Sequence, residues 1–180
     1  MKNIIYCFIG LFAVISCETR QSGNPEVEIQ TGLGDIIIEL YPDKAPASVA
    51  AFLSNIDSGY YKDCSFYRVL TDQNQPSNAP KAELIQGGVW KSNYSMSRQA
   101  ARVPHESTKQ TGLRHTSGAL SFARQEPGTV GTEFFIVIGD QPGFDYGGNN
   151  NPDGEGYAVF GKVIRGMNIV YKIQSRPEYE

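Results

Sequence analysis

The sequence is short of the residues that metal and thiol chemistry require. It has only two histidines and three cysteines in 180 residues, so a histidine-based metal site has little to draw on. Two of the cysteines, Cys7 and Cys17, lie near the N-terminus, which leaves Cys64 alone in the body of the chain. A single thiol cannot form an internal disulfide. We therefore expect packing to hold the fold together, with Cys64 as a small buried apolar residue.

An excess of positive charge is also missing. Lysine and arginine number 16 against 19 acidic residues, for a net charge of −3. This balance argues against a nucleic-acid partner. The hydrophobic content of 40% and charged content of 19% are ordinary for one globular domain with a real core. Nineteen glycines and ten prolines indicate many turns between short elements.

No apolar run is long enough to span a membrane as a helix. The longest covers residues 4–15, follows Lys2, and is typical of a signal peptide. It ends in Ser16-Cys17, which resembles the bacterial lipobox and implies lipidation of Cys17 after cleavage before it. The alternative is a plain secretory signal with an incidental cysteine. We predict a lipoprotein signal peptide over residues 1–16, a lipidated tether over 17–25, and attachment to a membrane of the bacterial cell envelope.

The rest of the chain, residues 26–180, reads as short strands with two helices. One helix begins near Pro46, where Val49, Phe52, Leu53 and Ile56 repeat with helical spacing. Residues 167–173 suit a second helix, whereas residues 89–117 contain no clear element. Many strands with two helices predict a mostly β, closed antiparallel sheet. The expected strands cover residues 27–30, 36–40, 65–70, 84–86, 118–122, 134–138 and 157–163.

Two other groups of residues raise alternatives that we consider weaker. Asp145, Asp153 and Glu155 lie in a Gly/Asn-rich loop, but their spacing lacks the order of a calcium-binding loop. The segment His105-Glu106 with His115 could suggest a catalytic or metal pair, although partnered structural roles are commoner for such residues. We therefore expect no bound metal.

Several sequence blocks follow one another in order: residues 46–52 (PASVAAF), 59–61 (GYY), 66–69 (FYRV), 86–88 (QGG), 118–123 (GALSFA), 133–136 (EFFI) and 156–163 (GYAVFGKV). In this order they resemble the cyclophilin family of peptidyl-prolyl cis/trans isomerases. Any one block is weak, but together they cover nearly all of residues 26–174. The resemblance implies a cyclophilin-like β-barrel with two capping helices, no cofactor, and proline-containing unfolded polypeptides as substrates. The bacterial envelope form is the most similar version.

The same resemblance implies the residues of the site. Arg68 corresponds to the hydrogen-bond donor to the proline nitrogen, and Gln86 to the glutamine that steadies it. Such a donor is sufficient because rotation about an X–Pro bond breaks no covalent bond. The amide only has to lose its resonance during the rotation. Phe134, which alternates with Phe135, is instead expected in the core. The implied substrate-binding residues are Leu84, Ala123, Arg124, Glu133, Phe135, Phe144 and Tyr157.

Some positions depart from the family pattern. Glu83 stands where a phenylalanine is usual, Glu133 replaces a glutamine, and a polar insertion covers roughly residues 71–82. These departures motivate an alternative, a non-catalytic module of the same fold that binds proline segments. The intact Arg68 argues against that alternative.

The last residues of the sequence do not suit a strand. Residues 175–180 contain a proline and three charges without apolar alternation. We therefore expect the final closing strand to be missing and the barrel to be open beside residues 27–30. Either the sequence is a C-terminally truncated fragment, which we favour, or a partner strand completes it. A complete barrel would be expected to be monomeric.

Overall fold

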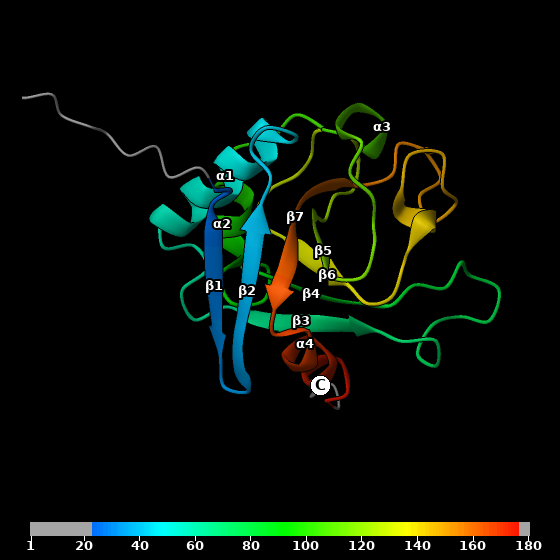
Figure 1. Ribbon diagram of the computed structural model, residues 1–180, viewed down its shortest axis with the longest axis horizontal. Helices are drawn as coiled ribbons and strands as arrows, with labels where there is room; N and C mark the ends of the chain where they lie inside the picture. Colours follow the sequence, from blue (N-terminus) through cyan, green and yellow to red (C-terminus); the bar gives the residue numbers. More distant parts are fainter. Residues whose placement is uncertain (1–22, 177–180) are drawn as a thin grey trace, which may run out of the picture.

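The computed structural model describes residues 23–176, whose strands form one curled antiparallel sheet (Figure 1). The spatial order of the strands is β1-β2-β7-β5-β6-β4-β3, and every neighbouring pair is antiparallel. The mostly β antiparallel fold predicted from the sequence is therefore confirmed. The strands are β1 (Glu26–Thr31), β2 (Gly34–Leu40), β3 (Ser65–Leu70), β4 (Leu84–Gly88), β5 (Ala119–Phe122), β6 (Phe134–Val137) and β7 (Ala158–Arg165).

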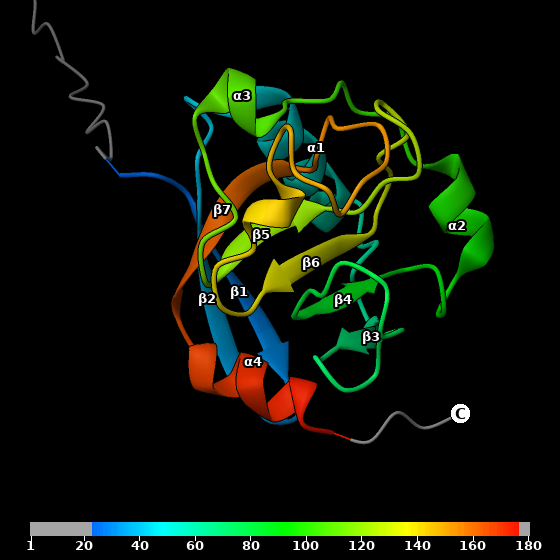
Figure 2. The same cartoon turned by 90° about the vertical axis from the view of Figure 1, so that its right-hand side faces the viewer.

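Two helices cover opposite ends of the curled sheet, as both views show (Figures 1 and 2). These are α1 (Pro46–Asp57) and α4 (Met167–Gln174), the two that the sequence predicted. Proline occupies the first turn of α1, where its missing N–H costs nothing. Val49 and Phe52 are buried on the face that packs into the sheet.

The prediction that residues 89–117 contain no element is wrong. Two short helices lie there, α2 (Tyr94–Gln99) and α3 (Thr108–Thr111). Helices of six and four residues are too short for an apolar period to show in a sequence. Local capping defines α2 instead, because the Asn93 side chain accepts a hydrogen bond from the Met96 N–H.

Alternate side chains along the strands fill two separate apolar clusters. On β6, Phe134 and Ile136 enter the main core inside the curl, as predicted for Phe134. Phe135 and Val137 point to the other face and join a smaller cluster with Leu84 and Phe144. Period-two alternation thus divides one strand between the core and the outer face of the sheet.

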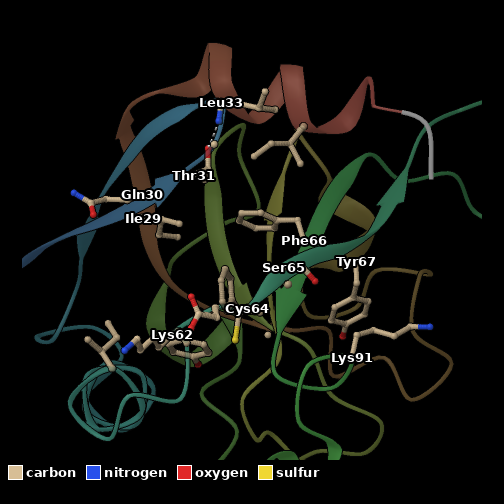
Figure 3. A pocket seen from close by; sticks show the side chains of 18 of the residues that line it. Ile29, Gln30, Thr31, Leu33, Lys62, Cys64, Ser65, Phe66, Tyr67 and Lys91 are labelled. Carbon is tan, nitrogen blue, oxygen red and sulfur yellow. Dashed lines mark hydrogen bonds between the residues drawn. The ribbon is translucent and has the colours of Figure 1, made fainter. Parts of the chain in front are cut away.

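The sheet is open between β1 and β3, its two edge strands. Because seven strands alternate in direction, β1 and β3 run the same way. Across the described residues 23–176 no strand pairs with their outer sides, and a cavity of about 1020 Å³ separates them. Ile29 and Phe66 point into this gap from its two walls (Figure 3). Over the described residues the sheet therefore forms an open half-barrel.

Some predictions fall on residues that lie outside the described range. These are the signal peptide, Cys17, most of the tether and the last four residues, 177–180. Between residues 23 and 176, no helix has the length and apolar character needed to cross a bilayer.

Candidate active site

A bulge in β3 gives two consecutive side chains access to the outer face of the sheet. The pairing register of β3 with β4 shifts between Phe66 and Arg68, which leaves Tyr67 as the extra residue. Phe66 packs against Phe134 on the core side. Tyr67 and Arg68 both reach Gln86 on β4. A regular strand would place one of them on the opposite face.

These side chains form a chain of hydrogen bonds that ends at Arg68. An Nη1–H of the exposed Arg68 donates to Gln86 Oε1 at 3.1 Å, and Gln86 Nε2 donates to the Tyr67 hydroxyl at 3.0 Å. The Tyr67 hydroxyl donates in turn to Glu133 Oε2. Burial first, and then the Glu133 carboxylate, raise the pKa of Tyr67 well above its ordinary value, so it remains a donor. The guanidinium of Arg68 is therefore held in one direction.

Glu133 anchors the far end of this chain. Its Oε1 accepts hydrogen bonds from the N–H groups of Val89 and Trp90, at 2.9 and 3.0 Å, where the chain leaves β4. Gly88 has a φ of +142°, and a Cβ there would collide with the Glu133 carboxylate. The glycine that ends the Gln-Gly-Gly block thus makes room for the group that supports Tyr67.

A cavity of about 490 Å³, with both apolar and polar residues in its walls, opens next to the Arg68–Gln86 pair. Leu84 and Phe135, both nearly buried, come from β4 and β6. Phe144, from the 3₁₀ turn η1 (Pro142–Phe144), packs edge-on against Phe135 and Tyr157. Such a cavity suits a small apolar ring placed beside a fixed cationic donor.

Comparison with known proteins assigns this arrangement to a family. Residues 26–180 match the family described as cyclophilin type peptidyl-prolyl cis-trans isomerase/CLD. The chain belongs to the cyclophilin family. It is therefore an isomerase of peptidyl-prolyl bonds, as the sequence predicted.

Relatives and solved structures of cyclophilins agree with this assignment. The chain is 37% identical over 155 residues to a peptidyl-prolyl cis-trans isomerase of Acinetobacter baylyi, covering 86% of this chain and 74% of the relative. It is 34% identical to peptidyl-prolyl cis-trans isomerase B of Escherichia coli, covering 82% and 83%. A Cryptosporidium parvum cyclophilin, crystallised in the presence of the dipeptide Ala-Pro, superposes with a TM-score of 0.63 at 26% identity, covering 85% and 87%.

The structure brings most of the predicted site residues of this cyclophilin together. Only Glu133 of the set does not line the 490 Å³ cavity, because its carboxylate binds Tyr67 and the turn after β4 instead. The sequence pattern gives Tyr67 no role, whereas the β3 bulge brings its hydroxyl to Gln86. The predicted residues that line the cavity are Arg68, Gln86, Leu84, Ala123, Arg124, Phe135, Phe144 and Tyr157.

Arg124 lines the cavity, but its side chain donates its hydrogen bonds to the loop that contains Asp153 and Gly156. Its side chain is fully buried, donates to both carboxylate oxygens of Asp153, and also donates to the Gly156 carbonyl. The guanidinium lies 5.3 Å from the centre of the Tyr157 ring. The hydrogen bond from Arg124 to the Asp153 carboxylate is the main reason that the pKa of Asp153 is lowered to about 2. Arg124 thus fixes the loop that carries Phe144 and Tyr157.

A buried serine, histidine and aspartate lie behind the cavity in a triad-like order. The Ser121 hydroxyl lies 2.9 Å from His115 Nε2, and His115 Nδ1 lies 2.8 Å from Asp145 Oδ1. Ser121 is 0% exposed and His115 is 1% exposed, so no substrate reaches them and acyl transfer is excluded. The His115 ring instead stacks on Phe135, at an interplanar angle of 9°. The three residues support the aromatic wall from behind.

The other groups raised from the sequence also have structural partners. Among residues 23–176 no cluster of three metal-ligating side chains occurs. Asp145 binds His115 and Asp153 binds Arg124, so these carboxylates are already paired. His105 Nε2 lies 3.1 Å from the Glu155 carbonyl, and Glu106 caps α1. Cys64 is half-buried, and burial raises its pKa, which suits a structural thiol.

Proposed function

We propose that the Arg68 cavity is the isomerase site and that Arg68 is its hydrogen-bond donor. The barrier to X–Pro rotation is about 18–20 kcal/mol because amide resonance must be lost. In the twisted state the proline nitrogen regains its lone pair and becomes an acceptor. A donor fixed in advance favours that state over both planar ground states. The observation that carries the proposal is the Arg68 guanidinium, held by Gln86 beside a cavity that Leu84, Phe135 and Phe144 line.

The cavity residues have matching roles in this proposal. Leu84, Phe135, Phe144, Tyr157 and Ala123 grip the proline ring and exclude water that would stabilise the planar amide. Gln86 orients Arg68 and offers its amide to the substrate backbone. Arg124 and Glu133, expected from the sequence to touch substrate, act by holding Tyr157 and Tyr67. No nucleophile or cofactor takes part in such a rotation.

The test is replacement of Arg68 on the domain from residue 24 onward. Arg68→Ala should lower kcat/KM for an X–Pro peptide on the order of a hundredfold, because one preorganised donor is typically worth about 3 kcal/mol. Arg68→Lys should retain part of the rate, since its ammonium is a donor without the planar fork. Arg165→Ala, an exposed strand arginine at the end of β7, is the matched control. Full activity of a folded Arg68→Ala protein would refute Arg68 as the donor.

We also propose that this isomerase assists protein folding at a membrane of the bacterial cell envelope. The support is the sequence alone: Lys2, the apolar run 4–15, and Cys17 directly after Ser16. The mature chain would begin at Cys17, with residues 17–25 as the tether, and its clients would be unfolded polypeptides that contain proline. One acyl chain binds membranes weakly, so a lasting anchor needs more than one chain, and a diacylglyceryl group on Cys17, usually with a third chain, would supply them.

Fractionation of cells expressing the full chain tests this anchor. Cys17→Ser should release the protein from the membrane fraction or leave it unprocessed, whereas Cys7→Ser should behave as the wild type. If the Cys17→Ser protein fractionates and migrates like the wild type, the lipoprotein proposal is wrong.

A further inference from the structure

The polar insertion between β3 and β4, residues 71–82, is a built loop held by its own side chains. It closes a hairpin whose last strand pair is Leu70 with Leu84, and it projects from the end of β3 (Figure 1). A two-residue turn would be enough to connect such a hairpin. The extra residues therefore need a reason other than connection.

Gln75 fastens the two ends of this loop together. Its Nε2 donates to the Thr71 carbonyl at 2.6 Å and to the Ala82 carbonyl at 2.7 Å. Its Oε1 accepts from the Ala82 N–H at 3.1 Å. The Gln75 side chain thus makes three hydrogen bonds to the backbone at the two ends of the loop, and these bonds hold the ends together.

Two more side chains, Asn74 and Lys81, hold the backbone of this loop in place. Asn74 accepts from the Thr71 N–H at 2.9 Å and donates to the Val69 carbonyl at 3.0 Å, so it ties the loop to β3. Lys81 Nζ donates to the carbonyls of Asp72 and Gln75, at 3.1 and 2.9 Å. The Lys81 ammonium group therefore makes its hydrogen bonds within the loop. A loop fixed in this way loses little conformational entropy when a ligand contacts it.

The framed loop forms one wall of the active-site cavity. Along β3 and β4 the Arg68–Gln86 pair comes first, the Leu70–Leu84 pair second and the loop third. Asn150, from the loop that carries Phe144, reaches the Lys81 carbonyl at 3.4 Å and joins the two walls. A peptide with its proline between Leu84 and Phe135 has further residues within reach of this wall. The loop residues that line the cavity are Asn74, Gln75, Pro76, Ala79, Pro80 and Ala82.

The wall carries no formal charge toward the cavity. Every loop residue that lines it is an amide, a proline or an alanine. Glu83, at the loop's end, turns away toward Gln174 on α4, at 3.4 Å. A charged substrate side chain pressed against such a wall would lose water without gaining a partner. Uncharged side chains would lose much less.

We propose that residues 71–82 form a substrate-recognition wall, fixed by Gln75 as a positioning residue, that selects uncharged side chains beyond the X–Pro pair. This proposal rests on the proposed isomerase site. It assigns the insertion the task of reading the polypeptide around the proline, while Arg68 acts on the bond itself.

Two Ala-Pro peptides separate recognition from rotation: one of four residues, and one of eight with uncharged flanks. NMR titration gives Kd, and exchange spectroscopy at saturation gives the rate on the enzyme. Gln75→Ala should raise Kd for the eight-residue peptide about five- to tenfold, on the scale of one or two hydrogen bonds. The loss of affinity should be smaller for the four-residue peptide, and the rates at saturation should fall less than the affinity does. Gln73→Ala, an exposed glutamine of the same loop, should match the wild type throughout.

A gain of specificity provides a second test that does not depend on loosening the loop. Pro76 is exposed and lines the cavity, whereas Ser77 is exposed and does not. Pro76→Glu should make an eight-residue peptide with lysine flanks bind more tightly than the uncharged one, reversing the wild-type order. Ser77→Glu should leave that order unchanged.

The outcomes are distinguishable. Equal losses on both peptide lengths for Gln75→Ala, or an unchanged preference in Pro76→Glu, would overturn the recognition wall. A wild-type domain that fails to accelerate even the four-residue peptide would instead overturn the proposed site.

Discussion

At the scale of single residues, the position of Arg68 depends on Tyr67. The β3 bulge turns Tyr67 to the same face as Arg68, and its hydroxyl both accepts from Gln86 and donates to Glu133. Without this hydroxyl, the Gln86 amide would have no acceptor for its Nε2–H at this position, and its orientation would no longer be fixed. The residue next to the proposed donor therefore has a positioning role in this site.

Tyr67→Phe is expected to lower kcat about tenfold, because Arg68 would sample more directions while the apolar ring remains. KM should change little, since the proline cavity is untouched. Exchange spectroscopy at saturating peptide measures the effect, and Tyr171→Phe, on the exposed side of α4, is the control. A Tyr67→Phe protein with the wild-type rate would show that Gln86 is held without the hydroxyl.

A second residue-scale prediction concerns His115 and pH. Burial lowers the pKa of His115 below its ordinary value of 6.5, against the opposing effect of Asp145. Below about pH 6.5 the unfolded chain therefore binds a proton that the folded chain does not. The free energy of unfolding should consequently fall as pH drops below 6.5 and be unaffected by this group above it.

Urea unfolding between pH 7.5 and 5 measures this dependence. A His115→Gln protein, less stable throughout, should lack the part of the slope that begins near pH 6.5. An identical slope in both proteins would assign the pH dependence to other groups.

At the scale of elements, α1 depends on a distant segment for its N-terminal cap. Ala45, at the N-cap position, has no side chain that can accept a hydrogen bond. The buried Glu106 supplies both acceptors instead, at 3.0 Å from the Ala47 nitrogen and 2.8 Å from the Ser48 nitrogen. A carboxylate at this end of a helix also meets the positive end of the helix dipole.

Glu106→Ala should therefore lower the free energy of unfolding by about 1–3 kcal/mol, since it leaves two N–H groups without an acceptor. Glu106→Gln should lose less, because one oxygen remains. Thermal and urea unfolding measure the change, with Glu26→Gln on the exposed edge of β1 as the control. Equal stability of the Glu106→Ala protein would mean that water replaces the cap.

The elements also show where sequence patterns were informative. Strand alternation and the Val49–Ile56 period predicted the strands and α1, because long segments record which face is buried. The α2 and α3 helices could not be predicted, since a few residues carry no period. The bulge at Tyr67 was invisible for a similar reason: one unpaired residue leaves no mark on strand composition.

At the scale of the whole molecule, the open gap between β1 and β3 exposes two strand edges and an apolar cavity. Since both edges run in the same direction, a single added strand can be antiparallel to each of them. Ile173 and Arg176, at the end of α4, line the gap, so a segment joined there can enter it. Filling the gap would pair backbone groups and bury apolar surface.

An engineered extension tests this reading of the fold. A strand of alternating valine and threonine, joined after α4 by a short glycine-serine linker, should raise Tm by several degrees, at about 4–8 °C per kcal/mol for small domains. An extension of the same length interrupted by prolines should not. If both extended proteins have the same Tm as the original domain, the open strand edges do not limit its stability.

The family, the strand-rich fold and most residues around the cavity could all be predicted from the amino-acid sequence. Those features reside in ordered blocks and in the alternation of apolar residues, which are local properties of the chain. The folded chain was needed to see that Tyr67 and Glu133 orient Gln86, that Arg124 holds a loop, and that Gln75 holds a cavity wall. Each of these depends on a hydrogen bond between polar groups whose partner is chosen by folding, and a polar side chain in a sequence does not specify its partner.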